Sequence, residues 1–197
     1  MYSPYAIEIR SAYPKKPSKP RIAFIGEAPG KEEVEKGRPF VGRSGKKLDM
    51  WLREAGLKRH RVLISNVFMQ RPENNKIDKF FIRPELAKEQ EIETWARLGI
   101  SPNNGLPFRE YRPHFYRLRK RLHKYQSKIV FAVGRTAFWA LVGNYALSYN
   151  LGERFEPKPF WKADFSVIPI YHPAYILRNH DRELESKIIQ SIANVQA

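Results

Sequence analysis

The chain has 197 residues, of which 42% are hydrophobic, and this apolar content is sufficient for the core of one ordinary domain. Lysine and arginine number 36 against 20 acidic residues, so the formal net charge is +16 and a polyanionic partner is expected. Cysteine is absent, which excludes disulfide bonds, thiolate-bound zinc, thiolate-bound iron and sulfur, and a thiol nucleophile.

The N-terminal residues 1–20 predict a basic arm, because the run 14–20 (PKKPSKP) is rich in lysine and stiffened by proline. This region has no apolar run of signal-peptide length, and the chain has no segment long enough to span a bilayer. We therefore expect an intracellular protein, cytoplasmic or associated with the nucleoid, that has no membrane partner. The remaining residues, 21–197, are expected to form one domain.

Four short apolar runs predict buried strands, at residues 21–25, 62–66, 129–133 and 167–171. Their hydrophobicity is continuous rather than alternating, which is typical of parallel strands covered on both faces. Helical patterns occur at residues 45–55, 85–98, 113–125, 135–142 and 181–195. This succession predicts an α/β fold, a single three-layer α/β/α domain with a central four-stranded parallel sheet.

Two segments rich in proline and asparagine, residues 71–82 and 99–110, predict surface loops. They flank a stretch of about residues 79–108 that we interpret as an insertion into the domain.

Polar residues follow three of the predicted strands. Glu27, Asn66 and His172 each stand at or just after a strand's carboxyl end, where parallel sheets open onto a ligand-binding crevice. Taken singly, each has a structural explanation, since Glu27 could cap a turn, Asn66 could bond backbone and His172 could be a satisfied rim histidine. Their joint position favours a site instead.

Three ordered motifs resemble those of the family 4 uracil-DNA glycosylases. Residues 26–42 (GEAPGKEEVEKGRPFVG) resemble the first motif, residues 66–72 (NVFMQRP) the second and residues 172–178 (HPAYILR) the closing one. The resemblance covers most of the chain from residue 21 to residue 178. It implies a monofunctional DNA-repair glycosylase that flips uracil out of DNA and hydrolyses its N-glycosidic bond, leaving free uracil and an abasic site.

The resemblance also implies roles for individual residues. Glu27 is similar to the acid that acts on the catalytic water or the sugar cation, and His172 to the group that stabilises charge at uracil O2. Phe40 resembles the ring that stacks on uracil, and Glu33 resembles a residue that lies beside C5 and helps exclude thymine. The residues expected to bind the base are Phe40, Asn66, Glu33 and Ala28.

The chemistry of the reaction agrees with these residue types. Breaking the glycosidic bond develops positive charge on the sugar and negative charge on uracil, so an anion and a hydrogen-bond donor are needed on opposite sides. Glu27 and His172 satisfy that requirement. An Asn66 amide can donate to uracil O4 and accept from N3–H, whereas cytosine reverses both positions. Stacking and these hydrogen bonds would offset the free energy of flipping the base.

The third motif is similar to a loop that enters the DNA minor groove, and Ile176 matches its usual leucine wedge. Residues 42–45 could present backbone N–H groups to a phosphate at a helix start. The residues expected to contact DNA are Gly42, Ser44, Arg71, Pro173, Tyr175, Ile176, Leu177 and Arg178. Further phosphate contacts are expected from residues 58–61 (KRHR) and from the cations of residues 117–124, although the latter could equally be a solvated helix face.

The chain departs from the family pattern where a metal cluster would be bound. Family 4 enzymes typically hold an iron–sulfur cluster through four cysteines, and Gln70 and Tyr111 stand where two of these would be expected. No such cluster can form, so we expect no cofactor and no metal, and we expect the insertion around residues 82–98 to supply the missing packing.

Two other functions remain open from the sequence. The same fold could act on a different deaminated or oxidised base, or it could be a non-catalytic DNA-binding or replication-accessory module. In the favoured interpretation, the partner is DNA that contains uracil and the protein acts as a monomer.

Overall fold

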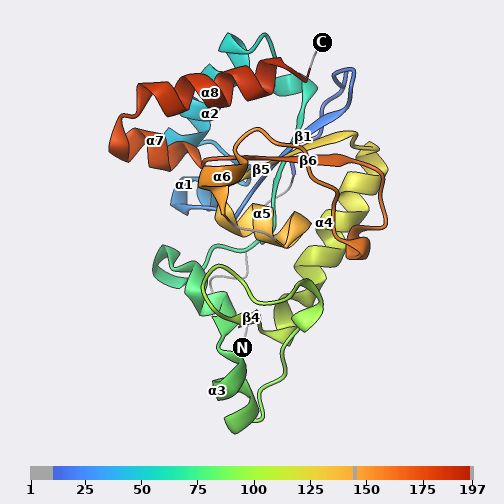
Figure 1. The fold of residues 1–197 in the computed structure, drawn as a ribbon, viewed down its shortest axis with the longest axis vertical. Helices are drawn as coiled ribbons and strands as arrows, with labels where there is room; N and C mark the ends of the chain where they lie inside the picture. The colour runs from blue at the N-terminus through green and yellow to red at the C-terminus, as the bar shows by residue number, and fades with distance from the viewer. Residues whose placement is uncertain (1–10, 144–145, 196–197) are drawn as a thin grey trace.

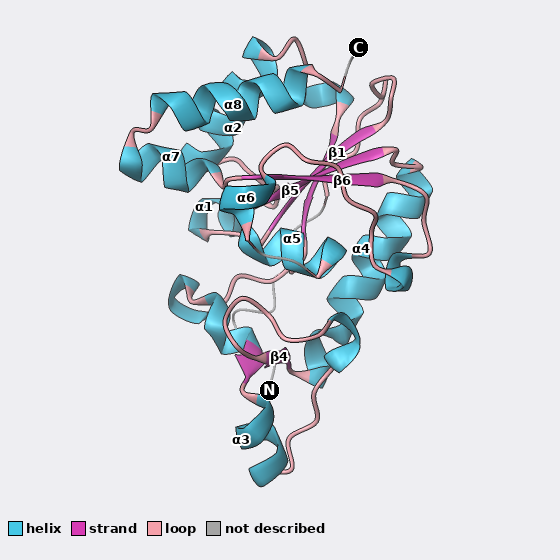
Figure 2. Ribbon diagram, in the orientation of Figure 1, coloured by secondary structure: helices cyan, strands magenta, loops and turns pink. Residues whose placement is uncertain are grey.

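The computed structural model describes residues 11–143 and 146–195. Its central sheet has four parallel strands in the order β2-β1-β5-β6 (Figures 1 and 2). The strands are β1 (Ile22–Gly26), β2 (Leu63–Asn66), β5 (Ile129–Val133) and β6 (Ser166–Ile170). Every strand residue except Ser166 is buried, because helices cover both faces of the sheet. The predicted α/β fold with a four-stranded parallel sheet is confirmed.

Two helical layers enclose the sheet (Figure 2). Along β1, Ile22 and Phe24 pack into one core and Ala23 and Ile25 into the other, as the alternating direction of strand side chains requires. The core that contains Phe24 is completed by α2 (Arg43–Glu54), α7 (Pro173–Asn179) and α8 (Arg182–Ala193). The core that contains Ala23 is completed by α4 (Arg112–Tyr125), α5 (Arg135–Val142) and α6 (Leu147–Asn150). The predicted three-layer architecture is therefore confirmed.

Shorter elements connect the layers. A short helix, α1 (Lys31–Lys36), follows β1. The 3-10 helices are η1 (Arg59–Arg61), η2 (Glu73–Asn75), η3 (Ile77–Phe80), η4 (Ala96–Leu98), η5 (Arg109–Tyr111) and η6 (Pro159–Trp161). No helix in the described part of the chain is long and apolar enough to cross a membrane.

The prediction of a helix over residues 85–98 is wrong. The chain forms α3 (Pro84–Glu89), turns at Glu91 with a positive φ of 52°, and then pairs with residues downstream. Thr94 forms an antiparallel bridge with Phe108, and the Trp95 N–H donates to the Pro107 carbonyl at 2.8 Å. These extended backbone bonds end the helix, because an amide committed to a neighbouring strand cannot continue the helical pattern.

The two predicted loops around this segment are also more ordered than expected. Residues Phe81–Ile82 (β3) and Leu106–Pro107 (β4) form a small antiparallel sheet. In Figure 1 the green segment that includes α3 projects away from the main sheet. The division of the chain into a domain and an insertion remains a prediction.

Residues 11–20 of the predicted arm lie along the edge strand β2. The backbone groups of Ala12 and Ile64 exchange two hydrogen bonds of 2.9 and 3.1 Å. Further along, the Ser18 N–H donates to the Arg61 carbonyl at 2.8 Å, so the arm runs antiparallel to β2. The first part of the predicted arm, residues 1–10, lies outside the described residues.

Candidate active site

The strand order places a crevice at the carboxyl ends of β1 and β5. From β1 the chain passes to β2 on one side of the sheet and then crosses to β5 on the other side, so the two connections diverge there. A cavity of about 850 Å³ opens at this point. Its walls include a residue at or just after the end of each strand, namely Glu27, Asn66, Gly134 and His172.

All six residues predicted for catalysis and base binding line this one cavity. They are Glu27, Ala28, Glu33, Phe40, Asn66 and His172, and the predicted DNA contacts Ser44, Tyr175 and Arg178 line it too. The structure thus brings together side chains that are far apart in the sequence, although their roles are a separate question.

Glu27 follows β1 and is tied to the start of α5. The Thr136 hydroxyl donates a hydrogen bond of 2.5 Å to Oε2 of Glu27, whereas Oε1 bonds none of the residues that the structure describes. Burial raises the pKa of Glu27 above its ordinary value of 4.5, and the hydrogen bond from Thr136 opposes this increase. One carboxylate oxygen is therefore fixed by the protein while the other remains available at the cavity.

Phe40 is held in a backbone conformation that is unusual for a bulky residue. Its φ is 52° and its side chain is only 5% exposed. A Cβ at Gly45 would lie 1.9 Å from the Phe40 carbonyl oxygen, and a Cβ at Gly26 would lie 2.6 Å from Cζ of its ring. Glycine at both positions therefore permits the close approach that places the ring in the cavity wall.

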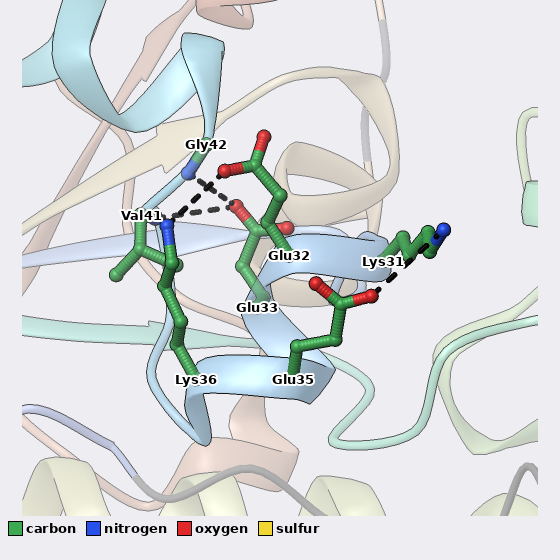
Figure 3. Close-up of polar contacts among 7 residues, drawn as sticks. All are labelled: Lys31, Glu32, Glu33, Glu35, Lys36, Val41 and Gly42. Atoms are coloured by element: carbon green, nitrogen blue, oxygen red, sulfur yellow. Dashed lines mark hydrogen bonds and ion pairs between the residues drawn. The ribbon is translucent and has the colours of Figure 1, made fainter.

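Glu33 anchors the loop that carries Phe40. Its Oε1 accepts backbone N–H groups from Val41 and Gly42, each at 3.2 Å, as Figure 3 shows. This contact gives Glu33 a structural task that the sequence does not reveal. The Gly42 N–H is therefore already bonded and Gly42 does not line the cavity, and its contact with a phosphate remains a prediction.

Asn66 is the last residue of β2, and the residue as a whole is 2% exposed. Its side-chain amide forms no hydrogen bond with any described residue. The alternative explanation, in which the Asn66 side chain bonds a backbone group, therefore does not apply in the described part of the chain. A Cβ at Gly26 would lie 2.5 Å from Asn66 Oδ1. The amide therefore sits tightly against the end of β1 with its donors and acceptor unused, as expected of a ligand-reading group.

His172 caps the N-terminus of α7, because its Nδ1 accepts the Ala174 N–H at 3.2 Å. Burial lowers the pKa of His172 to about 4, with a further contribution from the charge of Arg178. The ring is therefore neutral at pH 7, and since Nδ1 is an acceptor, the proton resides on Nε2. The ring centroids of His172 and Phe40 are 5.8 Å apart, so both groups face the same space.

The predicted wedge loop is instead the helix α7, which begins with Pro173 in its first turn. Ile176 is 2% exposed and packs in the core beside α8, and its prediction as the wedge that contacts DNA remains untested. Tyr175 is 39% exposed and its ring lies 4.8 Å from that of Tyr171. Pro173 is buried and Leu177 half-buried, and neither lines the cavity.

Other predicted cations lie away from the cavity. Arg71 lines a separate cavity of about 470 Å³ with Gln70 and Tyr111. Arg59, from the KRHR run, pairs with Asp49 at 2.6 Å and donates to the Pro39 carbonyl at 2.7 Å. Two cavity residues that sequence reasoning missed are Arg135 and Tyr171. Thr136 was missed as well. The sequence Gly134-Arg-Thr follows β5, so the expectation that polar residues after a strand's carboxyl end line the crevice applies to Thr136 too.

The residues at the family's cluster position do not fit an iron–sulfur cluster. Gln70 Oε1 lies 3.1 Å from Nε2 of His114, and the Tyr111 ring lies 4.2 Å from that of Phe80. These side chains are amide, imidazole and aromatic groups that already contact one another, whereas such clusters need thiolates. Packing is also supplied from the predicted insertion, where Trp95 stacks on Phe115 at 4.4 Å.

Comparison with known proteins agrees with this geometry. The model of the uracil DNA glycosylase superfamily matches residues 14–193. The chain is 33% identical over 178 residues to a type-4 uracil-DNA glycosylase of Thermotoga maritima, covering 90% of this chain and 77% of that protein. It is 32% identical over 163 residues to a type-4 uracil-DNA glycosylase of Archaeoglobus fulgidus, covering 81% and 68% of the two chains. The chain therefore belongs to the uracil-DNA glycosylase superfamily.

Proposed function

We propose that this protein is a monofunctional uracil-DNA glycosylase that acts in base excision repair. Its substrate is DNA that contains uracil, and its products are free uracil and an abasic site. The observation that carries the proposal is the meeting of Glu27, Phe40, Asn66 and His172 at one cavity. Membership of the superfamily and the names of the two relatives support the same activity.

Recognition begins with a uracil that has left the base stack. The Phe40 ring offers a face on which the base stacks, and the unused amide of Asn66 offers one donor and one acceptor for O4 and N3–H. Cytosine presents the opposite pair of groups, so it would leave Asn66 unsatisfied. Glu33 lines the cavity beside this loop, and we assign it to the C5 side of the base, where it would restrict a methyl group.

Bond cleavage follows from the charges around the cavity. The electron pair of the C1′–N1 bond moves to uracil, and the neutral His172 donates its Nε2–H to O2 as negative charge develops there. On the sugar side, the Glu27 carboxylate stabilises the developing cation, orients the water and accepts its proton as the water oxygen bonds to C1′. No covalent bond to the protein is needed, which fits a monofunctional enzyme.

The proposed reaction needs only residues that one chain brings to one cavity, so we propose that a single copy is active. Its substrate also supports an intracellular location, cytoplasmic or associated with the nucleoid.

The decisive experiment measures uracil release from a uracil-containing duplex, followed by alkaline cleavage at abasic sites. The wild-type protein should release uracil, and Glu27→Gln should slow the reaction by about 100-fold or more because it removes the charge near the sugar. Glu32→Gln is the matched control, since Glu32 lies on α1 and pairs with Lys36 outside the cavity. No uracil release by the wild-type protein would overturn the proposal and favour a non-catalytic module. If hypoxanthine, xanthine or hydroxymethyluracil is released from a matched duplex faster than uracil is, the enzyme would be assigned to that lesion instead.

A further inference from the structure

A second surface of the molecule concentrates positive charge away from the cavity. We call it the basic face and define it by the arm residues Lys15, Lys16 and Lys19 and the α4 residues Arg117, Lys120, Arg121 and Lys124. Arm and helix touch here, because Lys124 Nζ lies 5.9 Å from the centre of the Tyr13 ring. The charges of two segments that are far apart in the sequence therefore form one patch.

The basic face has no acidic residues of its own. The segments 11–21 and 112–125 contain neither aspartate nor glutamate. Among the residues that the structure describes, the cations Lys15, Lys16, Lys19, Lys120, Arg121 and Lys124 form no ion pair with an acidic side chain. These six like charges, gathered without an acidic partner among the described residues, lower the stability of the fold, so an external anion is the natural means of compensation.

Arg121 adds an independent observation to this pattern. Its Nη1 atom is buried and has no hydrogen-bond partner. Burial lowers the pKa of Arg121, Tyr13 opposes that shift, and the neighbouring Arg117 adds to it. A half-buried guanidinium with an unsatisfied donor beside another cation is unfavourable, and an anion close to the exposed part of the guanidinium would reduce that cost.

The C-terminal end of α4, which carries part of the basic face, lies at the opposite end of the sheet from the cavity. Arg21, which precedes β1, donates through Nη1 to the Tyr125 carbonyl at 2.9 Å, so the C-terminal end of α4 is near the amino ends of the strands. The cavity is at their carboxyl ends, about 15 Å away along a five-residue strand. In Figure 1 the yellow C-terminal half of α4 accordingly lies on the side of the sheet away from α1 and α7.

We propose that the basic face is a second DNA-binding surface, which holds the phosphate backbone of a duplex segment other than the one whose base enters the cavity. On α4, Arg117, Lys120, Arg121 and Lys124 recur at spacings of three and four residues, so they present one charge or more per helical turn of about 5.4 Å. Such regular spacing suits the closely spaced phosphates of a nucleic acid. The choice of DNA as the partner rests on the proposed function.

The test compares two triple variants that remove equal charge. Lys16→Gln/Lys120→Gln/Lys124→Gln changes the basic face, and Arg83→Gln/Lys88→Gln/Arg97→Gln changes three exposed cations of the segment that projects from the domain. Binding of a uracil-free duplex is measured by fluorescence anisotropy over a series of salt concentrations. We expect the first variant to bind at least about tenfold more weakly at low salt, with a salt slope reduced by about 3, and the second to change little.

Two further measurements make the test specific. Single-turnover uracil release at saturating enzyme should be unchanged in both variants, because neither alters the cavity. Energy transfer between a labelled uracil-containing duplex and a labelled uracil-free duplex should appear with wild-type protein and disappear with the first variant. An unchanged salt slope or absent energy transfer in the wild type would overturn the second surface, whether or not uracil is released. If polyglutamate binds the basic face at concentrations at which the uracil-free duplex does not, the face would be assigned to an acidic protein. That result would also overturn the proposal.

Discussion

The Thr136 hydroxyl lies 2.5 Å from Oε2 of Glu27, and this hydrogen bond joins the ends of β1 and β5 where the sheet order reverses. The bond has two physical effects, since it fixes the orientation of a buried carboxylate and favours its ionised form. Thr136 therefore acts as a positioning residue for Glu27.

Thr136→Val removes the donor while keeping the volume of the side chain. Because burial alone would then set the pKa of Glu27, the carboxylate should protonate at higher pH and the acid limb of the pH profile should move upward. We also expect single-turnover uracil release at pH 7 to fall by about tenfold, as one charge-assisted hydrogen bond is lost. Thr136→Ser should restore both properties. An acid limb at the same pH in wild type and Thr136→Val would contradict the assignment.

Gly26→Ala should obstruct the cavity from within. The new methyl group would lie 2.5 Å from Asn66 Oδ1 and 2.6 Å from Cζ of Phe40, and both groups would have to move. Displacement of two base-binding groups should reduce uracil release by about 100-fold or more. Gly37→Ala is the control, because that glycine has a φ of 62° but no atom within 4 Å of an added Cβ. Equal activity of the two variants would show that the cavity is not the reaction site.

Tyr175 and Ile176 should separate DNA contact from folding. Tyr175→Ala should weaken binding to uracil-containing duplex with little change in the free energy of unfolding, because its ring is 39% exposed beside the cavity. Ile176→Ala should instead destabilise the fold by about 2–5 kcal/mol, since the side chain is buried in the core. Urea unfolding and anisotropy titrations measure the two effects, and a reversed pattern would show that Ile176 leaves the core to contact DNA.

His114 should make stability depend on pH. Burial lowers its pKa to about 4, with a smaller contribution from Arg121, so the folded state binds fewer protons than the unfolded state between pH 6.5 and 4. Stability is therefore complete above pH 6.5 and falls as the pH decreases through this window, by roughly 3 kcal/mol for this residue. His114→Asn can keep an acceptor for the Met69 N–H and should flatten this dependence in urea unfolding at pH 7 and 5. If the free energy of unfolding of the variant changes with pH as steeply as that of the wild type, His114 is not a source of the pH dependence.

Sequence patterns predicted the main architecture well because hydrophobic burial dominates it. The four strands and the helices α2, α4, α5 and α8 lie within two residues of their predicted bounds, whereas the shorter helices α1, α6 and α7 were not predicted. The helix over residues 85–98 failed because Thr94 and Trp95 pair with a partner strand that local pattern does not reveal. The burial of Ile176 was not predicted either, since the third motif gave its position in the chain but not the face of α7 that it occupies.

The candidate site was predictable where a residue follows a strand, as with Glu27, Asn66 and His172. Contacts that depend on three-dimensional folding were not. Glu33 bonds the backbone of Val41 and Gly42 across a turn, and neither spacing nor residue type indicates that bond. The tautomer of His172 likewise follows only from the Ala174 N–H that points at its Nδ1.

The left-handed backbone of Phe40 makes four positions interdependent during evolution. A side chain larger than hydrogen at residue 26 or 45 would collide with Phe40, and loss of the Glu33 carboxylate would release the turn that follows it. Single substitutions at these sites should therefore be purged, whereas compensated combinations could survive. Among descendants of this gene, residues 26, 33, 40 and 45 should accordingly be inherited as one co-varying unit rather than drift separately.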